Sequence, residues 1–246
     1  MIPVRSEFPT ELLFPEELSV SFEGFGSDAF DTLQSIKEAP HIETYRSLKK
    51  VIEPSIIQPF KRFRDDLAVN WVLPNMLPFE TERNVFSRLL KNDFGAGGCH
   101  HHLWLSFYRV GLRRLKDIQI AHTLRESGFS TSLFLGENAP SLFNAVKAQI
   151  HANPGAFLEL VNRLLQREGW AFRVRPHKAM HGEYLEYKSE LATIPGEIGR
   201  AKGMWWTTFS PKESILNQGG PLLEKSILAI RDLWPLYLLL LDKPHR

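Results

Sequence analysis

The sequence predicts a single α+β domain built on an antiparallel sheet that packs against several helices. Segments 102–108, 118–123 and 129–135 alternate apolar and polar residues, which predicts a central three-stranded meander. Turn residues 126–128 separate the second and third segments. Because we find no internal repeat and no low-complexity linker, we expect one domain over residues 41–246.

Composition fits a globular protein of a reducing compartment. The 246 residues are 43% hydrophobic and 24% charged, which allows a sizeable core and does not indicate disorder. The single cysteine excludes an intramolecular disulfide framework. No secretory signal is visible, and the longest apolar run, residues 233–241, is too short to span a bilayer. We therefore expect a cytoplasmic protein with no membrane-spanning segment.

The first part of the chain is predicted to be an irregular arm followed by helices. Residues 1–40 contain several prolines and isolated phenylalanines, and we expect one short helix there, at residues 28–38. Helical spacing of apolar residues predicts a helix over 42–52 and another that follows Pro54 or Pro59. Residues 70–94 have a weak pattern that a short helix or an extended segment would satisfy. A possible strand within the arm lies at residues 18–22.

The chain after the meander alternates helices and strands. Pro235 removes a hydrogen bond from the last helix and should kink or divide it. The expected elements are helices over 140–151 and from Pro154, strands near 170–174, 184–187 and 203–209, a helix from Ser210 to about 219, and a helix over 222–241.

Charge is distributed unevenly, although the net charge is only +2. Residues 1–40 carry two basic and eight acidic side chains, whereas residues 41–130 carry fourteen basic and nine acidic ones. The densest basic cluster follows the first strand of the meander and consists of Arg109, Arg113, Arg114 and Lys116. Four cations at one rim of a sheet can contact the phosphates of a nucleic acid. A solvated basic loop is the alternative interpretation.

Aromatic residues next to the basic cluster add a possible stacking surface. Trp104 and Tyr108 share one face of the predicted strand, and Phe107 points to the other. Indole and phenol rings can stack on unpaired bases, so both residues join the predicted nucleic-acid site. Because rings on opposite faces cannot all be exposed, some of them must belong to the core.

The motif LWLSFY at residues 103–108, Arg113-Arg114 and Asp117-Ile118-Gln119 resembles bacterial proteins of the DUF2461 type. It also resembles the amino-terminal recognition domains of McrB-type restriction ATPases, and the similarity extends over about residues 40–240. The resemblance implies an accessory or recognition domain, in some relatives linked to nucleic-acid restriction. The chain has no GxxxxGK[ST] phosphate loop, so any motor or nuclease would be a separate polypeptide.

Metal binding is a weaker possibility. Consecutive ligands on a strand diverge, so within Cys99-His100-His101-His102 only alternate residues can share an ion. His177 and His181 have the HxxxH spacing, but Lys178 replaces the glutamate of a zinc protease. A polar cluster at the entrance of a strand is the simpler interpretation, and we expect no metal and no cofactor.

Catalytic motifs are few. Glu186-Tyr187-Lys188 matches the ExK fragment of metal-dependent nucleases, without the upstream Pro-Asp. There is no GxSxG elbow for a serine nucleophile. Trp205-Trp206 and residues 236–241 suit either a protein interface or the core.

The leading hypothesis is a non-catalytic domain that recognises DNA or RNA, as an accessory of a bacterial defence or restriction system. A separate ATPase or nuclease subunit is the expected partner. The alternatives are a protein-interaction module without nucleic-acid binding and a metal-dependent nuclease or hydrolase that uses Glu186 and Lys188.

Overall fold

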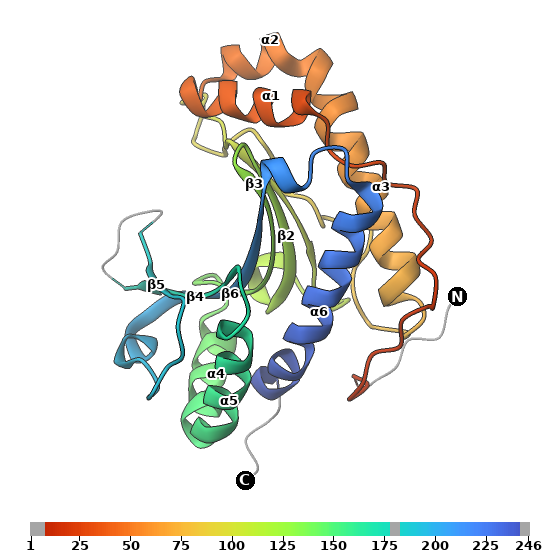
Figure 1. Ribbon diagram of the computed structural model, residues 1–246. Helices are drawn as coiled ribbons and strands as arrows, with labels where there is room; N and C mark the ends of the chain where they lie inside the picture. The colour runs from red at the N-terminus through yellow and green to blue at the C-terminus, as the bar shows by residue number, and fades with distance from the viewer. Residues whose placement is uncertain (1–7, 178–182, 242–246) are drawn as a thin grey trace.

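The computed structural model describes residues 8–177 and 183–241 and confirms the α+β class (Figure 1). A six-stranded antiparallel sheet forms its centre, in the order β1-β2-β3-β6-β4-β5. The strands are β1 (His102–Phe107), β2 (Gln119–Arg125), β3 (Gly128–Leu135), β4 (Trp170–Pro176), β5 (Leu185–Tyr187) and β6 (Ala201–Pro211).

The predicted meander is confirmed as β1, β2 and β3. Trp104 faces Thr123 in the β1–β2 register, and Thr123 faces Ser130 in the β2–β3 register. Glu126 and Ser127 form the turn between β2 and β3. Gly128 follows with φ +149°, and a Cβ there would lie 2.2 Å from the Ser210 carbonyl oxygen. Only glycine fits at this close approach of β3 and β6.

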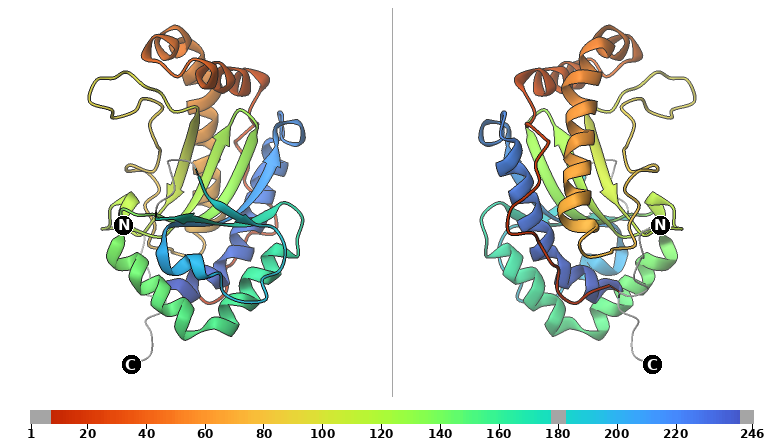
Figure 2. Two further views of the ribbon diagram at one scale, coloured as in Figure 1. Left: turned by 90° about the vertical axis from the view of Figure 1, so that its left-hand side faces the viewer. Right: turned by 90° about the vertical axis from the view of Figure 1, so that its right-hand side faces the viewer.

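Strand β6 joins the two halves of the sheet. It pairs with β3 on one side and with β4 on the other, so the meander and the C-terminal strands form one continuous sheet. The sheet is so strongly twisted that β4 and β5 run across the lower ends of β1–β3 (Figure 2). The right-handed twist of successive strands produces this crossing.

The two faces of the sheet differ in composition. Alternate residues such as Leu133, Phe172 and Trp206 are fully or almost fully buried against the helices, and we call this the core face. The opposite face carries small residues such as Ser132 and Thr207 together with a few larger rings, and we call it the open face. Alternation along each strand therefore separates the packed side from the side that can meet a partner.

Helices α3 and α6 lie on the core face of the meander (Figures 1 and 2), and Phe157 of α5 contacts the rings of Phe172 and Trp206. Helix bounds are α1 (Ser27–Glu38), α2 (Ile42–Ile52), α3 (Gln58–Leu67), α4 (Pro140–Ala152), α5 (Pro154–Leu165) and α6 (Gly219–Leu241).

The helix predicted after Pro54 or Pro59 is present as α3, but no break separates it from the helix before it. The predicted helix over 42–52 is confirmed, but the chain stays helical through Pro54 and Pro59. Two π-helical turns, η1 (Glu53–Ile57) and η2 (Ala68–Val72), flank α3. In η1 the wider turn relieves the clash between the Pro54 ring and the carbonyl of the residue four positions earlier, so one long curved helical segment forms.

The C-terminal predictions need two corrections. The helix expected from Ser210 is wrong, because β6 continues to Pro211 and only one 3-10 turn follows, η5 (Lys212–Ser214). A division of the last helix at Pro235 is also wrong, since α6 is continuous to Leu241. A second 3-10 turn, η4 (Gly196–Arg200), precedes β6.

No helix within residues 8–177 and 183–241 is long and apolar enough to cross a membrane.

The N-terminal arm is held by side chains of α3, of η2 and of the turn that follows η2. Asp66 accepts hydrogen bonds from the backbone amides of Ser21 and Phe22 at 2.8–3.0 Å and from the Ser21 hydroxyl at 2.6 Å. Asn70 pairs with both backbone groups of Ser19, and Asn75 does the same for Leu13. The possible strand at 18–22 is therefore an extended segment that pairs with helix side chains instead of a strand.

Replacing Asp66 should weaken this attachment. We expect Asp66→Ala to lower the free energy of unfolding by about 2–4 kcal/mol, because three donors lose their acceptor in a buried position. Urea denaturation measures the effect, and Asp65→Ala on the exposed side of the same helix is the matched control with little change. Equal losses in both variants would contradict the role of Asp66.

His122 lies in the core among phenylalanine rings. Its side chain is fully buried, with its ring centroid 5.3 Å from that of Phe63. Its Nδ1 lies 3.1 Å from the Thr131 hydroxyl, which in turn lies 3.4 Å from the Ser226 hydroxyl. Burial lowers the pKa of His122 to about 3. The imidazole is therefore neutral in the folded protein.

This burial makes stability depend on pH. Below pH 6.5, the ordinary pKa of histidine, the unfolded chain binds a proton at His122 and the folded protein does not. The free energy of unfolding therefore decreases as the pH is lowered from about 6.5 toward 3. Between pH 7 and pH 5 the wild type should lose about 2 kcal/mol more free energy of unfolding than His122→Gln. Chemical denaturation at both pH values checks this, and parallel losses would contradict it.

Candidate nucleic-acid interface

The predicted basic cluster lies in the loop that joins β1 to β2. Val110, Gly111 and Leu112 turn the chain, with φ +83° at Gly111, and one 3-10 turn follows, η3 (Arg114–Lys116). The loop is close to the lower end of the meander, where β4 and β5 cross it (Figure 1). Its four cations nevertheless have three different environments.

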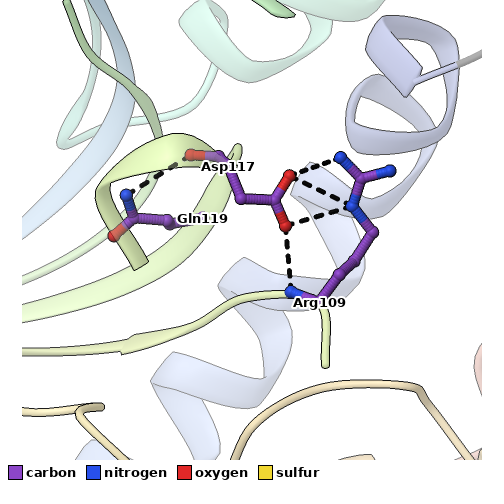
Figure 3. Close-up of polar contacts among 3 residues, drawn as sticks. All are labelled: Arg109, Asp117 and Gln119. Atoms are coloured by element: carbon purple, nitrogen blue, oxygen red, sulfur yellow. Dashed lines mark hydrogen bonds and ion pairs between the residues drawn. The ribbon is translucent and has the colours of Figure 1, made fainter. Parts of the chain in front are cut away.

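Arg109 is committed to an internal ion pair. Its Nε and Nη2 donate hydrogen bonds to the Asp117 carboxylate at 2.5–3.0 Å, and its backbone amide donates a further one at 2.9 Å (Figure 3). Asp117 is fully buried, and Gln119 donates to its carbonyl oxygen at 3.4 Å. Burial alone would lower the pKa of Arg109, but the hydrogen bonds and the charge of Asp117 raise it. The ion pair of Arg109 with Asp117 thus closes the loop and leaves the charge of Arg109 compensated within the protein.

Tyr108 is part of the core. The residue is 3% exposed, and its hydroxyl donates a hydrogen bond to the Arg83 carbonyl oxygen at 2.7 Å. Burial raises the pKa of this phenol. A ring held in this way fixes residue 83 against the end of β1 and presents no face to a ligand. The base-stacking role predicted for Tyr108 therefore has no exposed ring surface to support it.

Trp104 and Arg114 form a stacked pair on the open face. The Arg114 Cζ atom lies 4.4 Å from the centroid of the Trp104 ring, within the range of a cation–π interaction. The Arg114 Nη1 atom donates a hydrogen bond to the Phe86 carbonyl oxygen. Burial lowers the pKa of Arg114, and the positive charge of Arg88 lowers it further. Among the described residues no carboxylate forms an ion pair with this guanidinium.

The pair lines a pocket of about 370 Å³ at the β1 edge of the sheet. The segment before β1 forms its opposite wall, and Ser87 accepts a hydrogen bond from the Trp104 amide at 2.9 Å. The pocket contains arginine, histidine and aromatic side chains but neither aspartate nor glutamate. The lining residues are Asn84, Phe86, Ser87, Arg88, Leu90, His100, Trp104, Arg114 and Leu115.

Arg113 and Lys116 are exposed beside this pocket. Within the described parts of the chain neither residue forms an ion pair, so both charges face solvent. Val110, Leu112 and Leu115 of the same loop are 54%, 44% and 42% exposed. The loop surface is therefore cationic and apolar at once.

Sequence reasoning considered His100 only as a possible metal ligand, and it missed Arg88 and Phe86 as parts of this site. They belong to a segment without helical or strand periodicity, which an isolated bridge between Phe86 and Leu105 fixes to β1. A pattern search would find Arg88 only as one more basic residue near the cluster.

Cys99 and the histidines after it have different contacts. Cys99 is buried and donates through Sγ to the His41 carbonyl oxygen at 3.3 Å, and burial raises the pKa of its thiol. The rings of His100 and His102 are 5.4 Å apart. Over residues 8–177 and 183–241, no three His, Cys, Asp or Glu residues are arranged to hold a metal ion. His181, of the HxxxH pair, lies outside the described residues.

Glu186 and Lys188 form a surface ion-pair cluster. Glu186 bonds to Arg173 at 2.6 Å and to Lys188 at 2.7 Å. Burial alone would raise the pKa of Glu186, but these two cations lower it. The carboxylate is therefore already occupied by two cations of the same protein.

The apolar residues considered as a protein interface lie in two different environments. Trp206 is 1% exposed in the core, whereas Trp205 lies on the opposite face of β6. Leu236 and Leu240 are buried, and the rest of that run packs against the core.

No protein-family model matches the chain, and no curated protein is similar to it. The resemblance to the DUF2461 type and to McrB-type recognition domains therefore stays a prediction. The function has to be inferred from the geometry of the chain itself.

Arg109 and Arg113 make a matched pair for testing these environments. We expect Arg109→Gln to lower the free energy of unfolding by about 2–4 kcal/mol, because it leaves the buried Asp117 unpaired. Arg113→Gln at the exposed position of the same loop should change it by less than about 0.5 kcal/mol. Thermal and urea unfolding measure both, and a similar small effect for the two variants would contradict the structural role of Arg109.

Proposed function

We propose that the protein recognises nucleic acid, DNA or RNA, at the pocket of Trp104 and Arg114, without catalysing a reaction. The observation that carries this proposal is a guanidinium stacked on an indole in a pocket whose lining has no carboxylate. Uncompensated positive charge in a partly desolvated site favours an anionic ligand. An aromatic ring beside that charge favours a ligand with flat bases.

The two side chains supply different parts of the recognition. The Arg114 fork, with one nitrogen already fixed by the Phe86 carbonyl, directs its remaining donors to a phosphate or to a base edge. Because Arg114 covers one face of the Trp104 ring, an unstacked base would stack on the guanidinium plane or on the other face of the ring. Arg88 lines the same pocket, and the exposed Arg113 and Lys116 extend the positive surface beyond it. These contacts to phosphates position a strand without reading its sequence.

The role in the cell follows from the resemblance. A recognition domain that lacks an ATPase motif would act as an accessory of a defence or restriction system, and a separate ATPase or nuclease subunit would supply the chemistry. The exposed Val110, Leu112 and Leu115 give such a subunit an apolar contact next to the pocket. The same three side chains favour a protein-interaction module as the second candidate function.

Arginine and tryptophan variants test the proposal. We expect Arg114→Gln and Trp104→Leu to raise the Kd for a labelled oligonucleotide by about tenfold, measured by fluorescence anisotropy at fixed salt. Arg114→Gln should also reduce the slope of log Kd against log salt by about one. Arg231→Gln, an exposed arginine of α6 on the other side of the sheet, is the matched control and should bind as the wild type does.

Two outcomes would count against the proposal. If the wild type binds no oligonucleotide at low salt, the proposed nucleic-acid recognition is refuted. Unchanged affinity in both pocket variants would place the binding elsewhere. If the wild type instead captures a protein partner and loses it on Leu112→Ser, the interaction module becomes the better explanation.

A further inference from the structure

The open face of the sheet carries four aromatic rings that do not belong to the core. Trp104, Phe134, Trp205 and Phe209 all lie on this face in the strand register, and none is part of the hydrophobic cluster. Phe209 is 39% exposed, and the other three are partly exposed. Other residues of this face are small and buried, such as Ser106 at 0% and Thr207 at 3% exposure, so four partly exposed rings beside them need an explanation.

Three of the rings lie against a glycine. A Cβ at Gly136 would meet the Phe134 ring at 2.7 Å, and one at Gly203 would meet Trp205 at 2.8 Å. Phe209 covers Gly128 in the same way, at 2.8 Å. Each ring therefore occupies the space that a side chain at the glycine would take. Rings over glycine also stabilise a sheet, but packing alone does not require that they stay exposed.

Phe134 and Trp205 form one continuous surface. They face each other across β3 and β6, their ring centroids are 5.0 Å apart, and their planes differ by 24°. Between this pair and Trp104 the open face carries only small residues, Thr123, Ser130 and Ser132 among them. Thr123 and Ser130 are partly exposed and Ser132 is buried, so no bulky side chain of these strands separates the rings. Trp104 is two strands away from Ser130 in the register, and Phe134 lies four residues after Ser130. These spacings place the Cα atoms of Trp104 and Phe134 about 16 Å apart.

Cations accompany the rings. Arg125 of β2 lies on the open face beside His102, and no described residue forms an ion pair or a hydrogen bond with its guanidinium. Burial lowers the pKa of Arg125, Glu126 raises it, and the nearby charge of Arg173 lowers it. Arg173 stands next to Trp205 in the β4–β6 register, and its Cζ lies 4.7 Å from the Tyr184 ring centroid. Arg114 completes the set at the Trp104 edge.

We infer that the open face is a stacking platform for single-stranded nucleic acid, with bases on Trp104, Phe134 and Trp205 and the phosphates near Arg114 and Arg125. Sheet faces that bind single strands use two or three aromatic rings in this manner, because every unpaired base has a π-face. A duplex keeps its bases stacked on one another and cannot use the rings. This inference rests on the proposed function and names its substrate class.

The arginines favour nucleic acid over a neutral ligand. Oligosaccharides also stack on exposed rings, but they do not compensate the charges of Arg114 and Arg125 that no carboxylate of the described chain pairs with. The phosphodiester backbone of a nucleic acid compensates both charges.

The test compares single and double strands in full-length protein. A fluorescein-labelled oligothymidylate or oligouridylate of about 12 nucleotides is titrated with wild type, Phe134→Leu, Trp205→Leu, Trp104→Leu and Phe94→Leu, followed by anisotropy. Phe94 is fully exposed on a loop away from the sheet and is the matched aromatic control. Thermal unfolding of each variant shows that a weaker affinity does not come from unfolding.

We expect the wild type to bind the single strand at least tenfold more tightly than a duplex of the same length and salt. Phe134→Leu and Trp205→Leu should each raise the Kd for the single strand by about fivefold or more, while Phe94→Leu leaves it unchanged. The affinity for duplex should be the same in the platform variants as in the wild type.

The outcomes separate this inference from the proposed function. If Trp104→Leu weakens binding but Phe134→Leu and Trp205→Leu do not, the pocket functions and the platform is overturned. Equal affinity for duplex and single strand also overturns the platform. If no oligonucleotide binds, both fail, and stacking of a neutral oligosaccharide on the same rings would then be the replacement explanation.

Discussion

The pairing of β3 with β6 is the interaction on which the whole sheet depends. It connects the meander to the C-terminal strands over eight residue pairs, from Gly128–Pro211 to Leu135–Met204. Because neighbouring residues point to opposite faces, the same pairing places Leu133 and Trp206 in the core and Phe134 and Trp205 on the open face. A shift of one residue would exchange the two sets and destroy the core and the surface together.

Much of this sheet could be predicted from the sequence. The alternation in β1–β3 and in β4 and β6 is a local property, and a half-buried strand makes it visible. The positions of the prolines misled the prediction in the helices, since π-helical turns around Pro54 accommodate a ring that an α-helix would not. Ser210 resembles a helix cap, but long-range pairing of β6 with β3 outweighs that local preference.

The site was predictable only in part. The basic cluster and Trp104 were found from composition, but a charge in the sequence does not show where its partner lies. Asp117, eight residues after Arg109, is brought to it by loop closure, and Tyr108 is withdrawn by a hydrogen bond to Arg83. The opposite wall of the pocket shows no apolar–polar alternation in the sequence. Isolated backbone bonds, such as the one from the Ser106 amide to the Val85 carbonyl oxygen, hold it to β1 without forming a continuous strand. Four cations that look alike in sequence therefore differ in structure: one closes a loop, one stacks on a ring and two face solvent.

The N-terminal arm links parts of the chain that are synthesised far apart in time. The Trp234 indole donates to the Pro9 carbonyl oxygen at 2.9 Å, across 225 positions, and the Phe22 carbonyl approaches Gly219 so closely that a Cβ would lie 1.9 Å away. The arm cannot reach its final place until α6 has left the ribosome. Contacts of such high sequence separation slow folding and leave apolar surface uncovered in the meantime. A nascent chain of this protein therefore completes the attachment of its N-terminal arm only after its last helix has been made.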